Sequence, residues 1–262
     1  MILESALKRD RMLVIAALAA VSIFAWAYTL AGVGMPMNAF EMTAMGDVGT
    51  VLTTPMPWSP RYALLVYLMW LTMMIAMMLP SAAPMVLLFA AIARRQQPQA
   101  VSQPGTAAFV AGYLAVWALF SACAALAHRG LEMSGFLTPM MTPTSALVGG
   151  ALLVAAGLYQ MTPLKQACLR SCREPIRFLT QHWRPGASGA ARMGVVHGAS
   201  CLGCCWVLML LLFFGGVMNL YWIAGIATYV LAEKLFPRAR WLSYATGAAL
   251  AVWGISVLAH AL

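Results

Sequence analysis

Residues 68 to 85 of the chain read Leu68-Met-Trp-Leu-Thr-Met-Met-Ile-Ala-Met-Met-Leu-Pro80-Ser-Ala-Ala-Pro84-Met85. None of these residues is charged. A helix rises about 1.5 Å per residue, so a run of this length nearly spans a hydrocarbon core of about 30 Å. The two prolines lack a backbone donor and clash with the preceding turn, which predicts a kink between Met78 and Pro84. Carbonyl groups freed by the kink must face protein or a polar cavity rather than lipid.

The composition of the whole chain indicates an integral membrane protein. Of its 262 residues, 63% are hydrophobic and 9% are charged, whereas about a quarter are charged in soluble domains. Apolar runs recur along the chain, and the polar segments between them are too short to form a second domain. The sequence therefore predicts one all-α domain, residues 1–262, folded as a polytopic membrane bundle of about seven helices. The predicted spans are 12–34, 62–93, 106–127, 145–161, 193–214, 218–235 and 242–259.

The basic residues predict the orientation of these spans. With a cytoplasmic N-terminus, only Arg61 and Arg129 fall on the external side. The internal segments then hold Lys8, Arg9, Arg11, Arg94, Arg95, Lys165, Arg170, Arg173, Arg177, Arg184, Arg192, Lys234, Arg238 and Arg240. Such an excess of internal positive charge favours seven spans, a cytoplasmic N-terminus and an external C-terminus in the bacterial inner membrane. It also accounts for the net charge of +9, so the lipid bilayer is the expected partner and nucleic acid is not.

One predicted span carries a group of metal-ligand side chains. His197, Cys201, Cys204 and Cys205 lie within nine positions, and their helical spacing places them on one broad face. Counted from Arg192, Cys201 would lie roughly 13 Å deep. At that depth the cysteines are either neutral thiols packed as apolar residues or thiolates neutralised by a metal. Sulfur with imidazole favours Cu(I) or Zn(II), and the abundance of methionine makes copper our preference.

A second cysteine pair, Cys168 and Cys172, follows the predicted span 145–161 at helical spacing. A disulfide is not expected in a reducing cytoplasm, which leaves a metal-handling or a free thiol pair. If residues 162–192 fold back beneath the bundle, this pair would meet His197 or Cys201. We therefore include both cysteines among the candidate ligands.

The methionines of residues 68–85 form two stripes on a helix. Met73 and Met77 lie on one line, and Met78 lies on the adjacent one. A thioether can bind Cu(I) but is also an ordinary flexible packing group. We name Met73 and Met77 as candidate ligands of a methionine-lined path. The methionines of the loop before the second span could form its mouth: Met35, Met37, Met42, Met45 and Met56.

Two pairs of charged or titratable residues near span ends have simpler interpretations. His128 and Glu132 have a spacing that can hold a metal, but an interfacial pair is the expected arrangement. Glu233 and Lys234 are expected to reach the lipid headgroups from the internal end of their span. An alternative is that the Glu233 carboxylate orients His197.

The motifs of the chain resemble an uncharacterised bacterial family described as predicted metal-binding integral membrane proteins, a domain of unknown function. The resemblance rests on Trp70-x-x-Met73-x-x-Ala76-Met77-Met78-Leu79-Pro80, on Tyr159-Gln160-x-Thr162-Pro163-Leu164-Lys165-x-x-Cys168-Leu169-x-x-Cys172-Arg173-x-Pro175, on His197-Gly198-x-x-Cys201-x-Gly203-Cys204-Cys205-Trp206-x-Leu208-Met209, and on Met218-Asn219-x-x-Trp222 with Glu233-Lys234. It covers most of the chain. It implies a membrane metal site without implying a reaction.

These observations lead to one main hypothesis and two alternatives. The main hypothesis is transport, delivery or storage of a soft metal such as Cu(I), with a metallochaperone or another membrane subunit as partner. The first alternative is a membrane redox protein or a subunit of a metal-dependent oxidase. The second is a structural subunit whose thiols bind nothing. The sequence contains no nucleotide fingerprint, catalytic triad or haem-attachment motif, so we expect a non-enzymatic role.

Overall fold

The computed structural model describes residues 2–34, 38–45, 58–96, 103–136, 145–236 and 240–261, and all regular structure in these ranges is helical. In chain order the elements are α1 (Ile2–Leu30), η1 (Gly32–Gly34), α2 (Ala39–Met45), α3 (Pro60–Gln96), α4 (Gln103–Met133), α5 (Ala146–Gln160), α6 (Pro163–Arg173), α7 (Pro175–His182), α8 (Gly186–Leu210), α9 (Leu212–Gly215), α10 (Leu220–Leu235) and α11 (Arg240–Ala261). The predicted all-α class is confirmed for this part of the chain. Most of the expected methionine-rich mouth lies outside the described residues, whereas Met42, in α2, packs against the core.

Five helical segments are long and apolar enough to cross a membrane: Arg11–Leu30, Pro60–Arg95, Gly105–Met133, Gly186–Gly215 and Arg240–Ala261. They correspond to five of the seven predicted spans. The other two appear as the shorter helices α5, of 15 residues, and α10, of 16 residues. At about 1.5 Å per residue each covers only about 22 to 24 Å. The α5–α6 pair is apolar and long enough to count as a sixth span if its 63° bend is included.

The end of α5 is dictated locally. Pro163 lacks the donor that would continue the helix, and the Thr162 hydroxyl caps the next helix by accepting a hydrogen bond from the Lys165 backbone N–H at 3.2 Å. The chain therefore turns sharply into α6. This turn carries Cys168 and Cys172 back towards the bundle rather than away from it.

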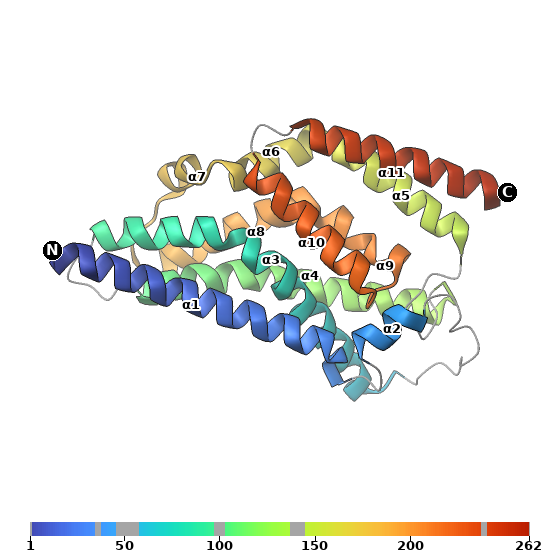
Figure 1. Cartoon of the computed structure of the whole chain (residues 1–262), viewed down its shortest axis with the longest axis horizontal. Helices are drawn as coiled ribbons and strands as arrows, with labels where there is room; N and C mark the ends of the chain where they lie inside the picture. Colours follow the sequence, from blue (N-terminus) through green and yellow to red (C-terminus); the bar gives the residue numbers. More distant parts are fainter. Residues whose placement is uncertain are drawn as a thin grey trace.

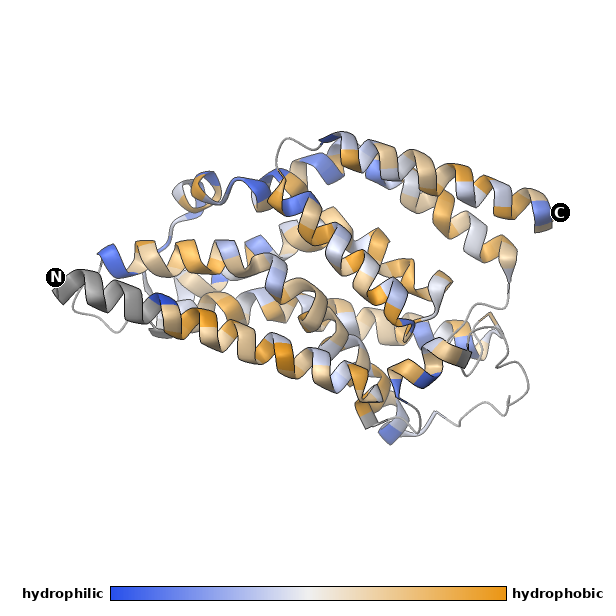
Figure 2. Ribbon diagram, in the orientation of Figure 1, coloured by the Kyte–Doolittle hydropathy of each residue, from blue (hydrophilic) through white to orange (hydrophobic). Residues whose placement is uncertain are grey.

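The helices pack in a few extensive pairs. α4 lies along α8, α5 lies along α11, α3 contacts both α1 and α4, and α6 lies against α8. Figure 1 shows α5 and α11 side by side at one edge of the molecule, and the start of α1 and the end of α11 at opposite ends of its long axis. Hydrophobic residues cover the long helices, while hydrophilic residues gather around α6, α7 and the helix ends (Figure 2).

Glycines allow the closest of these contacts. A Cβ atom at Gly194 of α8 would overlap the backbone carbonyl of Phe109 in α4. At Gly157 of α5 a Cβ atom would lie 2.5 Å from the carbonyl oxygen of Gly247 in α11. Small residues at these positions let two helix backbones approach directly. Gly157 and Gly194 are thus points of direct backbone contact between helices.

α3 contains both Pro80 and Pro84 and changes direction part-way along its length (Figure 1). Within the predicted kink, the Met78 carbonyl accepts hydrogen bonds from the Ser81 hydroxyl at 2.8 Å and the Tyr113 hydroxyl at 3.1 Å. This carbonyl therefore faces protein, as expected for a polar group that cannot be left to lipid. Tyr113 belongs to α4, so the bend is tied directly to the next helix.

Candidate metal centre

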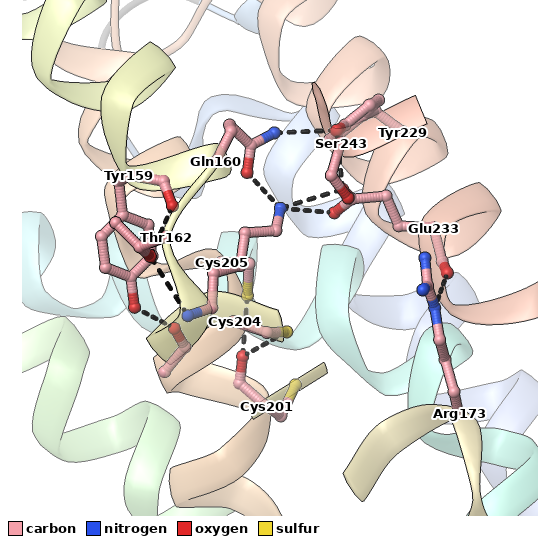
Figure 3. A network of polar contacts seen from close by, with 12 residues as sticks. Tyr159, Gln160, Thr162, Arg173, Cys201, Cys204, Cys205, Tyr229, Glu233 and Ser243 are labelled. Atoms are coloured by element: carbon pink, nitrogen blue, oxygen red, sulfur yellow. Dashed lines mark hydrogen bonds and ion pairs between the residues drawn. The ribbon is translucent and has the colours of Figure 1, made fainter. Parts of the chain in front are cut away.

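The candidate centre begins with three thiols in the middle of α8. Cys201, Cys204 and Cys205 are all buried, with at most 1% of their surface exposed. The Sγ atoms of Cys204 and Cys205 each lie 3.0 Å from the Cys201 carbonyl oxygen. Spacings of three and four residues place these side chains one turn apart on the same face. Figure 3 shows the three cysteines gathered around that carbonyl.

Three neighbouring helices add groups to these thiols. The Met78 Sδ atom of α3 lies 3.9 Å from the Cys205 Sγ atom. The Tyr113 hydroxyl of α4 lies 3.2 Å from the Cys201 Sγ atom. The Lys234 Nζ atom of α10 lies 3.0 Å from the same sulfur. The thiol of Cys205 therefore faces α3, and that of Cys201 faces α4 and α10.

Helix α6 supplies a fourth thiol. The partly buried Cys172 side chain packs against the core that contains Cys201, Cys204 and Cys205, and its thiol lies close enough to interact with those of Cys201 and Cys204. Cys168 lies one turn earlier, against Gly203 of α8, where an added Cβ atom would be 2.7 Å from its sulfur. The segment after α5 thus does fold back. It brings Cys172 into the thiol group and Cys168 to its edge. We call Cys172, Cys201, Cys204 and Cys205, with the thioether of Met78, the sulfur cluster.

His197 occupies a separate, aromatic environment one turn before Cys201. Its ring centroid lies 5.7 Å from that of Tyr113 and 5.3 Å from that of Phe178, and its Nδ1 atom is buried without a hydrogen-bond partner. Tyr113 stacks on His197 and contacts Cys201 through its hydroxyl. The imidazole is therefore adjacent to the sulfur cluster but lies beside aromatic rings.

The candidate methionines are buried as expected. Met73 and Met77 are at most 2% exposed and belong to the same core as the α8 cysteines. The thioether found in contact with a thiol is nevertheless that of Met78, on the adjacent stripe. Sequence spacing groups the methionines into stripes but does not show which stripe faces the α8 cysteines.

The expected roles of Glu233 and Lys234 are wrong in the structure. Both side chains are buried, at 0% and 7% exposure, and neither reaches outward to a headgroup region. The Glu233 carboxylate binds the Lys165 ammonium at 2.7 Å and so is not the partner of His197. α10 ends against α6 and α8, where these charges find partners inside the protein.

His128 is buried and Glu132 is half-buried, and the two side chains lie beside each other as expected from their spacing. The His128 Nε2 and Glu132 Oε2 atoms are 4.0 Å apart. The Trp70 indole donates to His128 Nδ1 at 3.4 Å, and the Trp58 indole donates to Glu132 at 3.1 Å. Because His128 Nδ1 accepts a hydrogen bond from Trp70, the neutral ring carries its proton on Nε2, facing Glu132. The His128 Nε2 and Glu132 Oε1 atoms are themselves buried without a hydrogen-bond partner in the described part of the chain.

The chemistry of the sulfur cluster fits a soft monovalent ion. Among the described residues, no three His, Cys, Asp or Glu side chains form a ready-made ligand set. The reason is visible at Cys204 and Cys205, whose thiols are turned towards the Cys201 carbonyl. Rotation about χ1 moves such side chains between staggered wells without moving the backbone. Three of the four thiols are buried and Cys172 is half-buried. Thiols and a thioether are donors that select soft ions such as Cu(I) over harder ions.

Comparison with known proteins points to the same metal. The family described as PpoB2, copper chaperone, matches residues 67–257. The chain belongs to this family. The matched range includes the bend of α3 and every residue of the sulfur cluster. No curated protein and no solved structure matches the chain significantly. Family membership supports a copper-handling role, as expected from the resemblance to a family of metal-binding proteins.

Proposed function

We propose that this protein is an integral membrane protein that binds Cu(I) as cargo at the sulfur cluster and passes it on. The observation that carries this proposal is the meeting of Cys172 from α6 with the three cysteines of α8 beside Met78. Cysteine also packs as a small apolar residue, but four thiols from two helices beside a thioether make up a set of donors that soft metal ions prefer. The copper chaperone family to which the chain belongs supports the choice of metal.

The surroundings of the cluster suit the charge of a copper–thiolate complex. Cu(I) bound by two thiolates carries a net charge of −1, which is costly to bury without a counter-ion. The Lys234 ammonium, 3.0 Å from Cys201, supplies one positive charge in a site with almost no solvent contact. Thiols must lose their protons to bind a metal, and Lys234 stabilises the charged state that results.

The membrane setting rests on the outer surfaces of the helices. Large hydrophobic side chains such as Phe24, Leu119 and Val252 are more than 65% exposed, which a bilayer would accommodate and water would not. We place the protein in the bacterial inner membrane with its N-terminus in the cytoplasm. Copper would approach along the methionines of α3, including Met73 and Met77. A metallochaperone or another membrane subunit would be its donor or acceptor.

Metal analysis of the detergent-purified protein tests this function. After expression with added copper, the Cys201→Ser, Cys204→Ser, Cys205→Ser variant is expected to retain at least about tenfold less copper than the wild type. Cys123→Ser is the matched control, because Cys123 is exposed and lies on α4. Equal copper contents in the wild type and the triple variant would refute the proposal. Zinc measured in the same samples separates the two candidate metals.

A further inference from the structure

The last turn of α10 presents two neighbouring charges to two different helices. The Glu233 carboxylate accepts hydrogen bonds from the Lys165 ammonium of α6 at 2.7 and 2.9 Å. The Lys234 ammonium donates to the Cys201 sulfur of α8 at 3.0 Å and to the Ser81 hydroxyl of α3 at 2.7 Å. Successive residues on a helix project about 100° apart, so one turn of α10 can contact both α6 and α8.

Further groups hold the Glu233 carboxylate in place. The hydroxyls of Tyr229 and Ser243 donate to its Oε1 atom at 2.7 and 2.6 Å. Gln160, at the end of α5, bonds to both Lys165 and Tyr229. Figure 3 shows Gln160, Tyr229, Glu233 and Ser243 converging on one side of the α8 cysteines. A buried ion pair this fully bonded has a defined geometry, because its oxygens have specific partners.

The same turn of α10 also holds the other end of α6. The Arg173 Nε–H donates to the Glu233 backbone carbonyl at 2.7 Å. Arg173 directly follows Cys172, and Lys165 lies near the start of α6. The short helix that carries Cys172 is thus bound to α10 on both sides of its cysteine. α6 also packs against α8, with Leu169 fully buried and Cys168 and Cys172 partly buried, so the contacts with α10 add to this packing at both ends of the helix.

We propose that Glu233 and Lys234 are positioning residues that hold Cys172 of α6 and Cys201 of α8 at one metal site. This inference rests on the proposed function for its copper-binding role. Glu233 fixes α6 through Lys165, and Lys234 fixes the Cys201 sulfur. Neither residue is a ligand. When the Lys165–Glu233 pair is broken, Cys172 leaves the sulfur cluster while the three cysteines of α8 remain.

A metal-free experiment tests the positioning directly. In a background that keeps only Cys172 and Cys201, the other four cysteines being serine, diamide oxidises the two thiols to a disulfide. The diazene of the reagent takes up both hydrogens and both electrons and becomes a hydrazine. The bond forms only when the two cysteines are within bridging distance. Glu233→Gln in this background is expected to slow disulfide formation about tenfold or more.

The matched control is Glu174→Gln. Its carboxylate also pairs with a basic side chain, Arg177, at 3.2 Å, but on the exposed surface, so the disulfide rate should stay within about twofold of the background. Ser243→Ala is a milder variant that leaves both charges in place. It is expected to slow the reaction a few-fold and serves if Glu233→Gln does not fold. If Glu233→Gln folds and its rate of disulfide formation is unchanged, the inference is overturned. If only Ser243→Ala folds, an unchanged rate in that variant overturns it. Both results hold whether or not the protein binds copper.

Copper X-ray absorption adds a signature that general destabilisation would not produce. If the inference holds, folded and copper-loaded Glu233→Gln has one sulfur fewer around copper than the wild type, as does Cys172→Ser. The Glu174→Gln protein keeps the wild-type number. A wild-type sulfur number in Glu233→Gln contradicts the inference. Equal copper in the wild type and the triple α8 cysteine variant refutes the function, and the disulfide rates then still decide the positioning role.

Discussion

Replacing Lys234 with leucine should weaken Cu(I) binding strongly. Leucine keeps the position apolar and offers no metal donor, but it removes the charge 3.0 Å from the Cys201 sulfur. At that separation two unit charges attract by about 5 kcal/mol when the effective dielectric constant is about 20. Breaking a buried pair by removing one partner typically costs about 3 to 5 kcal/mol. In the metal-free variant the thiol avoids this cost by keeping its proton, so the penalty appears when copper displaces that proton.

The expected loss in Cu(I) affinity is therefore about 10²-fold to a few thousand-fold. It would be measured by anaerobic competition with a colorimetric Cu(I) chelator in detergent. Arg177→Leu is the control, because Arg177 is exposed on α7 and the affinity of this variant should match the wild type. An opposing effect exists, since the ammonium also repels the incoming copper ion. If that repulsion dominates, Lys234→Leu binds copper as tightly as the wild type or more tightly, and the counter-ion role is refuted.

Three further predictions follow from individual contacts. Met78→Leu keeps the packing volume, so the free energy of unfolding should fall by less than about 1.5 kcal/mol. Competition titration should nevertheless show a several-fold loss of copper affinity. An affinity equal to that of the wild type would show that the Met78 thioether does not bind copper. His197→Ala leaves a cavity among aromatic rings and should lower the free energy of unfolding by about 2 to 4 kcal/mol. The number of sulfurs around copper should stay unchanged. If X-ray absorption shows a different number, the imidazole belongs to the metal site. Gly194→Ala pushes a methyl group into the Phe109 carbonyl and should lower the free energy of unfolding by about 1 to 3 kcal/mol. Gly225→Ala is the control, because a Cβ atom there has open space, and it should be neutral or stabilising by up to about 1 kcal/mol. Similar melting temperatures for the two variants would contradict the close α4–α8 packing.

Composition and local signals predicted much of the fold. Long uncharged runs correctly predicted α1, α3, α4, α8 and α11, because a helix that crosses the hydrocarbon core must be apolar over most of its length. The spans expected at 145–161 and 218–235 were found as shorter helices. For the first, the Thr162-Pro163 step is a visible stop signal. The sequence does not show, however, whether the chain beyond such a stop continues across the membrane or turns back.

The sequence predicted which cysteines form the candidate site, but it did not predict the charged side chains that surround them. The helical spacing in α8 predicted that Cys201, Cys204 and Cys205 share a face, and the fold-back of α6 was one recognised outcome for Cys172. Lys165 looked like one of many internal basic residues. Its partner Glu233 is 68 positions away, and nothing local connects the two. An acidic residue in the final turn of an apolar helix was the available signal that a buried cation lay opposite.

His197 illustrates the limit of spacing arguments. Sequence spacing placed it on the same face as the thiols, and the structure keeps it within one turn of Cys201. The neighbouring helices decide the surroundings of each turn, and α4 and α7 place the rings of Tyr113 and Phe178 beside the imidazole. A shared helical face therefore predicts direction. It does not predict which side chains of other helices fill the space in front of it.

The central claim is that one copper site joins α6 to α8 through sulfur. Copper K-edge X-ray absorption of the purified, Cu(I)-loaded protein tests this most directly, with wild type compared to Cys172→Ser and to the exposed control Cys123→Ser. The account predicts an all-sulfur shell that loses one sulfur in Cys172→Ser and is unchanged in Cys123→Ser. A shell of nitrogen or oxygen donors, or the same sulfur number in Cys172→Ser as in the wild type, would contradict it.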